Sequence, residues 1–154
     1  MRWIRVFLCV CVFLPSVRAA DLLQGLSEAE LAPGRMLRLP SAREGADIPV
    51  YLRATPGAKA TLVLLPGGSG GIGKIGPQGW PDSPNFLVRS APLFAAQGFN
   101  LAIVSRPSDQ TDMDYPFRVS APAMDDLRRV LRQVRSHFAG PVWVVGTSRG
   151  TVSG

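Results

Sequence analysis

The sequence predicts an α/β fold in which a mainly parallel sheet is connected by crossover helices. Three segments, residues 60–65, 99–105 and 141–146, are mainly apolar, which predicts strands buried on both faces of a sheet. Two segments with helical character separate them along the chain. Strands that alternate with helices form βαβ units, and the crossover in each unit places its two strands parallel in one sheet.

The elements before the first buried strand are short. Residues 20–34 form a leader in which a short helix is expected. Residues 35–39 and 48–54 alternate apolar and polar side chains, which predicts two strands, and the polar, glycine-containing segment between them predicts a turn. The segment of residues 60–65 then reads ATLVLL and is the first strand predicted to be buried on both faces.

The later elements alternate between helix and strand. A helix is predicted from Phe86 to Gln97, and the strand of residues 99–105 follows it. A second helix is predicted to begin at Ser120 and to end at Gly140, before the strand of residues 141–146. Apolar residues at helical spacing give this second helix one buried face, and its arginines fall largely on the solvated side.

The first twenty residues have the pattern of a targeting segment. Arg2 and Arg5 precede an apolar run over residues 6–14, and small residues follow it. This pattern predicts a secretory signal peptide over residues 1–19, cleaved after Ala19, and therefore a secreted or periplasmic protein. Because the run is far shorter than the roughly 20 residues of a membrane-spanning helix, no membrane association is expected after cleavage.

The composition outside the signal peptide excludes several function classes. The chain of 154 residues is 46% hydrophobic and 18% charged, which is typical of one packed globular domain. Removing residues 1–19 takes away three arginines and no acids, so the net charge falls from +6 to +3. No basic cluster with interleaved aromatic residues remains, so we expect no nucleic-acid partner. Both cysteines also leave with the signal, so the mature chain forms no disulfide.

A glycine-rich loop follows the first buried strand and fits four motif descriptions. Its amides could line an oxyanion hole, and its letters also match a dinucleotide fingerprint, most of a phosphate-binding loop, and a G-x-S-x-G nucleophile motif. The residues that carry the three letter matches are Gly68, Gly70 and Gly73; Gly68 to Lys74; and Gly67, Ser69 and Gly71.

The two nucleotide interpretations lack the structure that they need. A phosphate-binding loop leads directly into a helix whose amino terminus holds the anion. Three prolines and two glycines occur between residues 75 and 86, so no helix is expected there. Ile75 also stands where a phosphate-binding loop has Ser or Thr for magnesium. A nucleotide- or phosphate-binding module that uses Gly68 to Lys74 is kept as the alternative function.

A second G-x-S-x-G motif, residues 146–150, follows the last buried strand. A nucleophile elbow needs a strand, a sharp turn at the serine, and then a helix. Ser148 follows the strand, Gly146 and Gly150 stand on either side of the turn, and no helix breaker occurs before the end of the sequence. The small neighbours allow a strained serine backbone to pack closely. Ser148 is therefore the predicted catalytic nucleophile.

With these two motifs, "LLPGGSGG" and "GTSRG", the chain from residue 35 to residue 154 resembles the amino-terminal half of an α/β-hydrolase, similar to secreted serine esterases and dienelactone hydrolases. The resemblance implies a partial α/β-hydrolase domain whose carboxyl-terminal strands are missing. It also implies an oxyanion hole formed by the Arg149 amide and by the amide of Gly68 or Ser69. Pro66 stands where the family usually has a histidine.

The resemblance implies a serine hydrolase that cleaves a small ester, thioester or amide through an acyl-enzyme. The family's acid and histidine follow the serine, but the sequence has six residues after Ser148. Its one histidine, His137, precedes the serine and is expected to be a surface or capping residue. The activity is therefore expected of an intact parent enzyme, and this chain is expected to be inactive.

No cofactor and no metal ion are predicted for the site. Three acids, Asp109, Asp112 and Asp114, occur close together in the loop that follows the second buried strand. They resemble the start of a calcium-binding loop, but the required glycine and terminal glutamate are absent. The loop is therefore interpreted as solvated, in a position to line a substrate pocket. Arg149 is expected to point into solvent, with contact to an acidic substrate group as the alternative.

Overall fold

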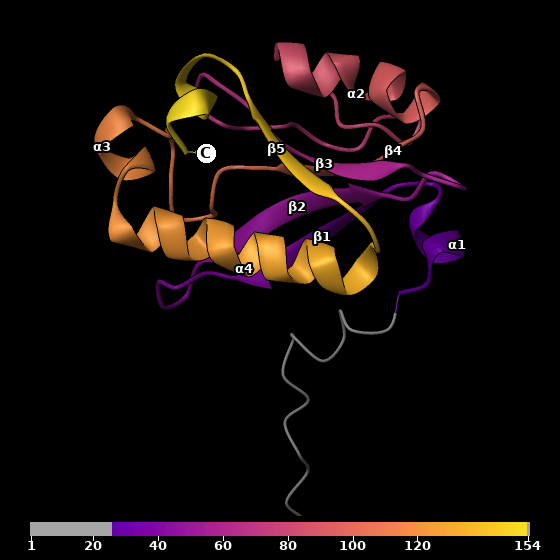
Figure 1. Cartoon of the computed structure of the whole chain (residues 1–154). Coiled ribbons are helices and arrows are strands. Elements are labelled where there is room, and N and C mark those ends of the chain that lie inside the picture. The colour runs from indigo at the N-terminus through magenta and orange to yellow at the C-terminus, as the bar shows by residue number, and fades with distance from the viewer. Residues whose placement is uncertain (1–25, 154) are drawn as a thin grey trace, which may run out of the picture.

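The computed structural model describes residues 26–153, so the predicted signal peptide and the first part of the leader lie outside the described residues. The described chain forms one five-stranded sheet in the order β1-β2-β4-β3-β5 (Figure 1). The strands are β1 (Arg35–Pro40), β2 (Asp47–Arg53), β3 (Ala60–Leu65), β4 (Phe99–Val104) and β5 (Val142–Gly146). The helices are α1 (Glu28–Leu31), α2 (Phe86–Ala96), α3 (Tyr115–Arg118), α4 (Ala121–His137) and the 3₁₀ helix η2 (Ser148–Ser153).

The sheet is mixed, so the prediction of a mainly parallel sheet in a partial α/β-hydrolase fold is wrong. β2 runs antiparallel to both of its neighbours, β1 and β4, whereas β3 is parallel to β4 and β5. The connection between β1 and β2 covers only residues 41–46. Such a connection permits an antiparallel hairpin, because a parallel crossover needs about a dozen residues or more. The sequence did indicate these two strands and their turn, but the predicted fold class took no account of their direction in the sheet.

Helices cover both faces of the sheet at its centre, which explains the mainly apolar sequence of β3. In Figure 1, α2 lies on one face and α4 on the other. Within β3, Leu62 and Leu64 pack in the cluster that includes residues of α2, and Val63 and Leu65 pack in the cluster that includes residues of α4. Successive side chains of a strand point to opposite faces. A strand that is covered on both sides therefore favours apolar residues at successive positions.

The predicted elements after the leader are confirmed to within about three residues at their ends. The predicted start at Ser120 is the N-cap of α4, where the Ser120 hydroxyl accepts a hydrogen bond from the Ala123 amide at 3.4 Å. The short helix α3 was missed because its four residues lie in a segment rich in polar and turn-forming residues. Its cap is Asp114, whose carboxylate accepts from the Phe117 amide at 2.9 Å.

None of the helices within residues 26–153 is long and apolar enough to cross a membrane. Even α4, at 17 residues, is amphipathic. Its buried residues include Val130 and Val134, while Arg128, Arg129 and Arg132 are not buried. The predicted division of this helix into a buried and a solvated face is confirmed.

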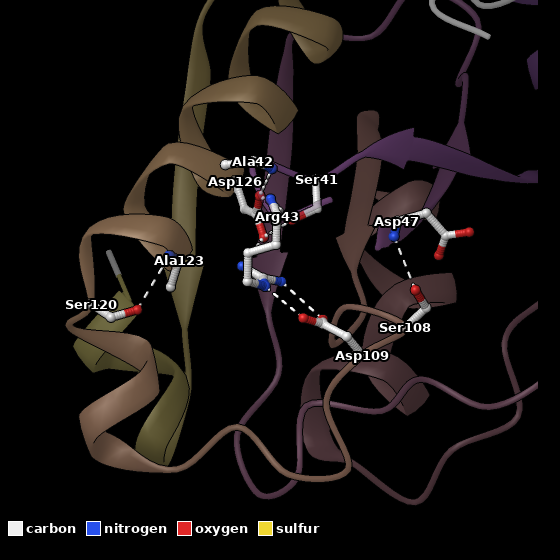
Figure 2. A network of polar contacts seen from close by, with 9 residues as sticks. All are labelled: Ser41, Ala42, Arg43, Asp47, Ser108, Asp109, Ser120, Ala123 and Asp126. Atoms are coloured by element: carbon white, nitrogen blue, oxygen red, sulfur yellow. Dashed lines mark hydrogen bonds and ion pairs between the residues drawn. The ribbon is translucent and has the colours of Figure 1, made fainter. Parts of the chain in front are cut away.

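A buried carboxylate on α4 ties this helix to the turn between β1 and β2 (Figure 2). Asp126 is only 4% exposed and accepts hydrogen bonds from the Ser41 hydroxyl at 2.8 Å, the Ala42 amide at 2.7 Å and Arg43 Nη1 at 2.9 Å. The same guanidinium donates to Asp109 from Nε at 2.6 Å and from Nη2 at 3.0 Å. One arginine thus connects the β1–β2 turn, α4 and the loop that follows β4.

The prediction that the last apolar strand is buried on both faces is wrong, because β5 is a partly exposed edge strand, and its exposure favours self-association. Among the described strands, β5 pairs with β3 alone, and the side chains of Trp143 and Val144 are 63% and 41% exposed. Unpaired backbone groups beside apolar side chains template pairing with another chain. We expect concentration-dependent association in size-exclusion chromatography with light scattering, and Val144→Lys should reduce it. Val119→Lys, which removes a 50% exposed valine outside the sheet, is the control. A monomeric wild type at high concentration would contradict this prediction.

Candidate functional site

The backbone at Ser148 is strained. Ser148 follows β5 at the start of η2 and has a φ of +50°, and it is the one non-glycine residue with positive φ in the described chain. Residues with side chains avoid this left-handed region at a cost of roughly 1–2 kcal/mol. The Ser148 residue is also exposed. Strain of this kind persists when the surroundings enforce it, and it is concentrated at functional sites.

Glycines around Ser148 make this turn possible. A Cβ on Gly150 would overlap the carbonyl oxygen of Leu65, and a Cβ on Gly146 would lie 2.6 Å from the Gly150 oxygen. A Cβ on Gly67, in the loop after β3, would lie 2.6 Å from the Thr147 oxygen. Each of these neighbours is backbone and cannot rotate away. The turn therefore needs glycine on both sides of the serine and in the facing loop.

The loop after β3 lies beside the Ser148 turn because β3 and β5 are parallel neighbours. A Cβ on Gly67 would lie 3.0 Å from Ser148 Cβ and 3.5 Å from the Arg149 nitrogen. The structure thus brings the loop that carries Gly68 and Ser69 next to Ser148 and Arg149. Within residues 26–153, the amides of Gly68, Ser69 and Arg149 donate no hydrogen bond. Unpaired N–H groups of this kind can stabilise an oxyanion.

Arg118 contacts both of these loops, and the sequence did not indicate it. Its residue is 2% exposed. Nη2 donates to the carbonyl oxygens of Pro66 at 3.1 Å and Gly68 at 3.2 Å, and Nη1 donates to the Ser153 hydroxyl at 3.1 Å. Burial lowers the pKa of this guanidinium, and the nearby Arg149 lowers it further. Arg118 lies on α3, in a polar segment for which the sequence predicts a loop, so the sequence does not indicate that it is buried.

The three acids of the loop after β4 have separate partners. Asp109 pairs with Arg43, whose hydrogen bond holds the pKa of that carboxyl below its usual value, and Asp114 caps α3. Arg149 is exposed, as expected. It is also paired with an acid, because its Nη1 lies 3.2 Å from the Asp112 carboxylate. Among the described residues, no group of three or more His, Cys, Asp or Glu side chains could hold a metal ion.

His137 lies far from Ser148. It ends α4 before β5 begins, whereas Ser148 follows the carboxyl end of β5. β5 lies between them along the chain, and its five residues at about 3.3 Å each span roughly 16 Å. Burial lowers the pKa of the His137 imidazole, which favours its neutral form. A charge interaction with the end of the helix would need the cation. The imidazole Nε2 lies 2.9 Å from the Gln133 side-chain nitrogen.

The glycine-rich loop does not lead into a helix. The first helix after Lys74 is α2, which begins at Phe86. A Cβ on Gly73 would overlap the backbone of Asp82, and the Asp82 amide donates to the Lys74 carbonyl at 2.8 Å. Gly73 thus allows a close approach of two chain segments within the loop. The helix amino terminus that a phosphate-binding loop requires is absent from this part of the described chain.

A pocket lies beside the start of the loop after β3, where Pro66 and Gly70 contribute to its wall. Apolar side chains from β3, α3 and α4 line it, together with Arg118, and Ser148 does not contribute to its wall. No family model, no curated protein and no solved structure matches the chain.

Proposed function

We propose that this chain carries the nucleophile and oxyanion hole of a secreted serine hydrolase that acts on small esters, thioesters or amides. The observation that carries the proposal is the strained Ser148, with a φ of +50°, next to a loop with free amides. A plain surface turn would gain nothing from strain at a serine. It would also not need glycines at three backbone contacts around that serine.

In the proposed reaction, Ser148 Oγ attacks the carbonyl carbon of the substrate, and its proton passes to a general base. The developing oxyanion accepts hydrogen bonds from the Arg149 amide and from the amide of Gly68 or Ser69. The leaving group departs with a proton from the same base, and water then hydrolyses the acyl-serine. The described residues place no histidine beside Ser148, so the proposal assigns the base to sequence outside residues 26–153.

The test is covalent labelling of the full product of the gene. An alkyl fluorophosphonate forms a bond to an activated serine oxygen and releases fluoride, so we expect one adduct, located on Ser148 by peptide mass spectrometry. Ser148→Ala should abolish the adduct, and the control Ser69→Ala should retain it. A form of the protein shortened to end at Gly154 should react at least roughly 10⁴-fold more slowly, because the proposal assigns the base to sequence outside residues 26–153.

Two results would contradict the proposed hydrolase. An adduct that survives Ser148→Ala, or that is found on Ser69, would remove the assignment of the nucleophile. Micromolar binding of ATP or NAD in a calorimetric titration, lost in Lys74→Ala, would support the nucleotide-binding alternative.

A further inference from the structure

The guanidinium of Arg118 is buried and satisfied entirely by neutral oxygens. Nε donates to the Met113 carbonyl at 2.8 Å, and the two terminal nitrogens donate to Pro66, Gly68 and Ser153. No described carboxylate forms an ion pair with it. Burying a charge is costly unless hydrogen bonds or an opposite charge compensate. The guanidinium is buried where the loop after β3, the loop before α3 and the end of η2 meet.

The loop after β3 has little conformational preference of its own. Gly68 and Gly70 have φ values of +60° and +77°, and glycine allows several backbone conformations at similar energy. A planar trans peptide holds its C=O and N–H in opposite directions. A flip of the peptide between Gly68 and Ser69 would therefore turn the Ser69 N–H into the protein. Hydrogen bonds to the carbonyl oxygens of this loop therefore have to fix the orientation of that peptide.

We propose that Arg118 is a positioning residue for the oxyanion hole, because it binds the Gly68 carbonyl and so turns the Ser69 N–H away from the interior. This inference rests on the proposed function. The same guanidinium holds Ser153 at the end of η2, the helix that begins with Ser148, so one side chain fixes the loops of both oxyanion donors. Asn85 supports the arrangement, since its Nδ2 donates to the Gly67 carbonyl at 3.3 Å and thereby sets the Gly68 N–H.

Kinetics of the full gene product test this role. Once a hydrolysed ester is found, Arg118→Met should lower kcat about tenfold to a hundredfold with KM unchanged, which is less than the roughly 10²–10³-fold lost with an oxyanion donor itself. Arg118→Lys should recover part of kcat, because an ammonium can still bind one of the carbonyls. Arg35→Met is the control, since it removes an arginine whose Nε donates to the Glu30 carbonyl, outside the proposed site. Its kcat should equal that of wild type when corrected for the folded fraction.

Nuclear magnetic resonance separates this inference from the proposed function. In ¹⁵N-labelled protein, the Gly68 and Ser69 amides should each give one sharp resonance. Arg118→Met should broaden or double both resonances, and the control Arg35→Met should leave them unchanged. This result would support the positioning role even if no fluorophosphonate adduct forms and the hydrolase proposal fails. Unchanged loop resonances in Arg118→Met, or a kcat equal to that of wild type, would overturn the positioning role. An adduct on Ser148 would in that case still support the hydrolase proposal.

Discussion

Gly150→Ala is expected to destabilise the protein by about 3 kcal/mol and to abolish fluorophosphonate labelling of Ser148. The added Cβ would overlap the carbonyl oxygen of Leu65, and its next neighbours are backbone atoms of Leu65 and Pro66. Overpacking of a tight site typically costs 1–3 kcal/mol, and we expect the upper end because no side chain can rotate away. The turn can relieve the overlap if η2 moves from β3, and that movement displaces Ser148 from the loop of Gly68. Urea unfolding and intact-mass labelling measure the two effects.

Gly76→Ala is the matched control for this substitution. Its Cβ would lie 3.5 Å from the Trp80 oxygen, an ordinary contact, and its φ is not in the left-handed region. The substitution should change the free energy of unfolding by less than about 1 kcal/mol, within the usual range of surface changes. A Gly150→Ala protein that unfolds at the same urea concentration as Gly76→Ala and still labels at Ser148 would show that the turn is not the rigid unit inferred here.

The sequence predicted the elements well because their signals are local. The strand of residues 60–65 and the helix that begins at Ser120 follow from hydrophobic periodicity and from a capping residue, and the structure has both. Strand direction is not a local property. The pairing of β2 with β4 joins residues about fifty positions apart, and no periodicity within either strand encodes whether they run parallel.

The predicted site residues follow from a motif in the sequence. Arg118, which contacts the loops that carry them, belongs to no motif. Gly146, Ser148 and Gly150 have a fixed spacing along the chain, so a spacing rule finds them. Arg118 forms hydrogen bonds with residues up to 52 positions away, and in the sequence an arginine in a polar segment looks like a solvated one. Its burial depends on how the loop after β4 folds over the loop after β3. That arrangement is a product of tertiary packing, which a single sequence does not display.

Asp126→Ala is expected to lower the free energy of unfolding by about 3–5 kcal/mol, the range measured when one partner of a buried ion pair is removed. The substitution leaves the Ser41 hydroxyl and the Ala42 amide without their acceptor, and it leaves Arg43 with Asp109 alone. A loss of this size is a large part of the roughly 5–15 kcal/mol that holds a domain together.

Asp125→Ala supplies the control for that prediction from the neighbouring position on α4. Its carboxylate pairs with Arg128, but the two side chains are 53% and 63% exposed, so the pair is worth at most about 0.5 kcal/mol. Urea unfolding of both variants compares the same chemical change in a buried and in an exposed setting. Equal stabilities would mean that the network in Figure 2 does not connect α4 to the β1–β2 turn. A loss of stability in Asp126→Ala alone would instead show that this carboxylate joins α4 to the β1–β2 turn. Through Arg43 and Asp109, the same network also holds the loop after β4, which leads to Arg118.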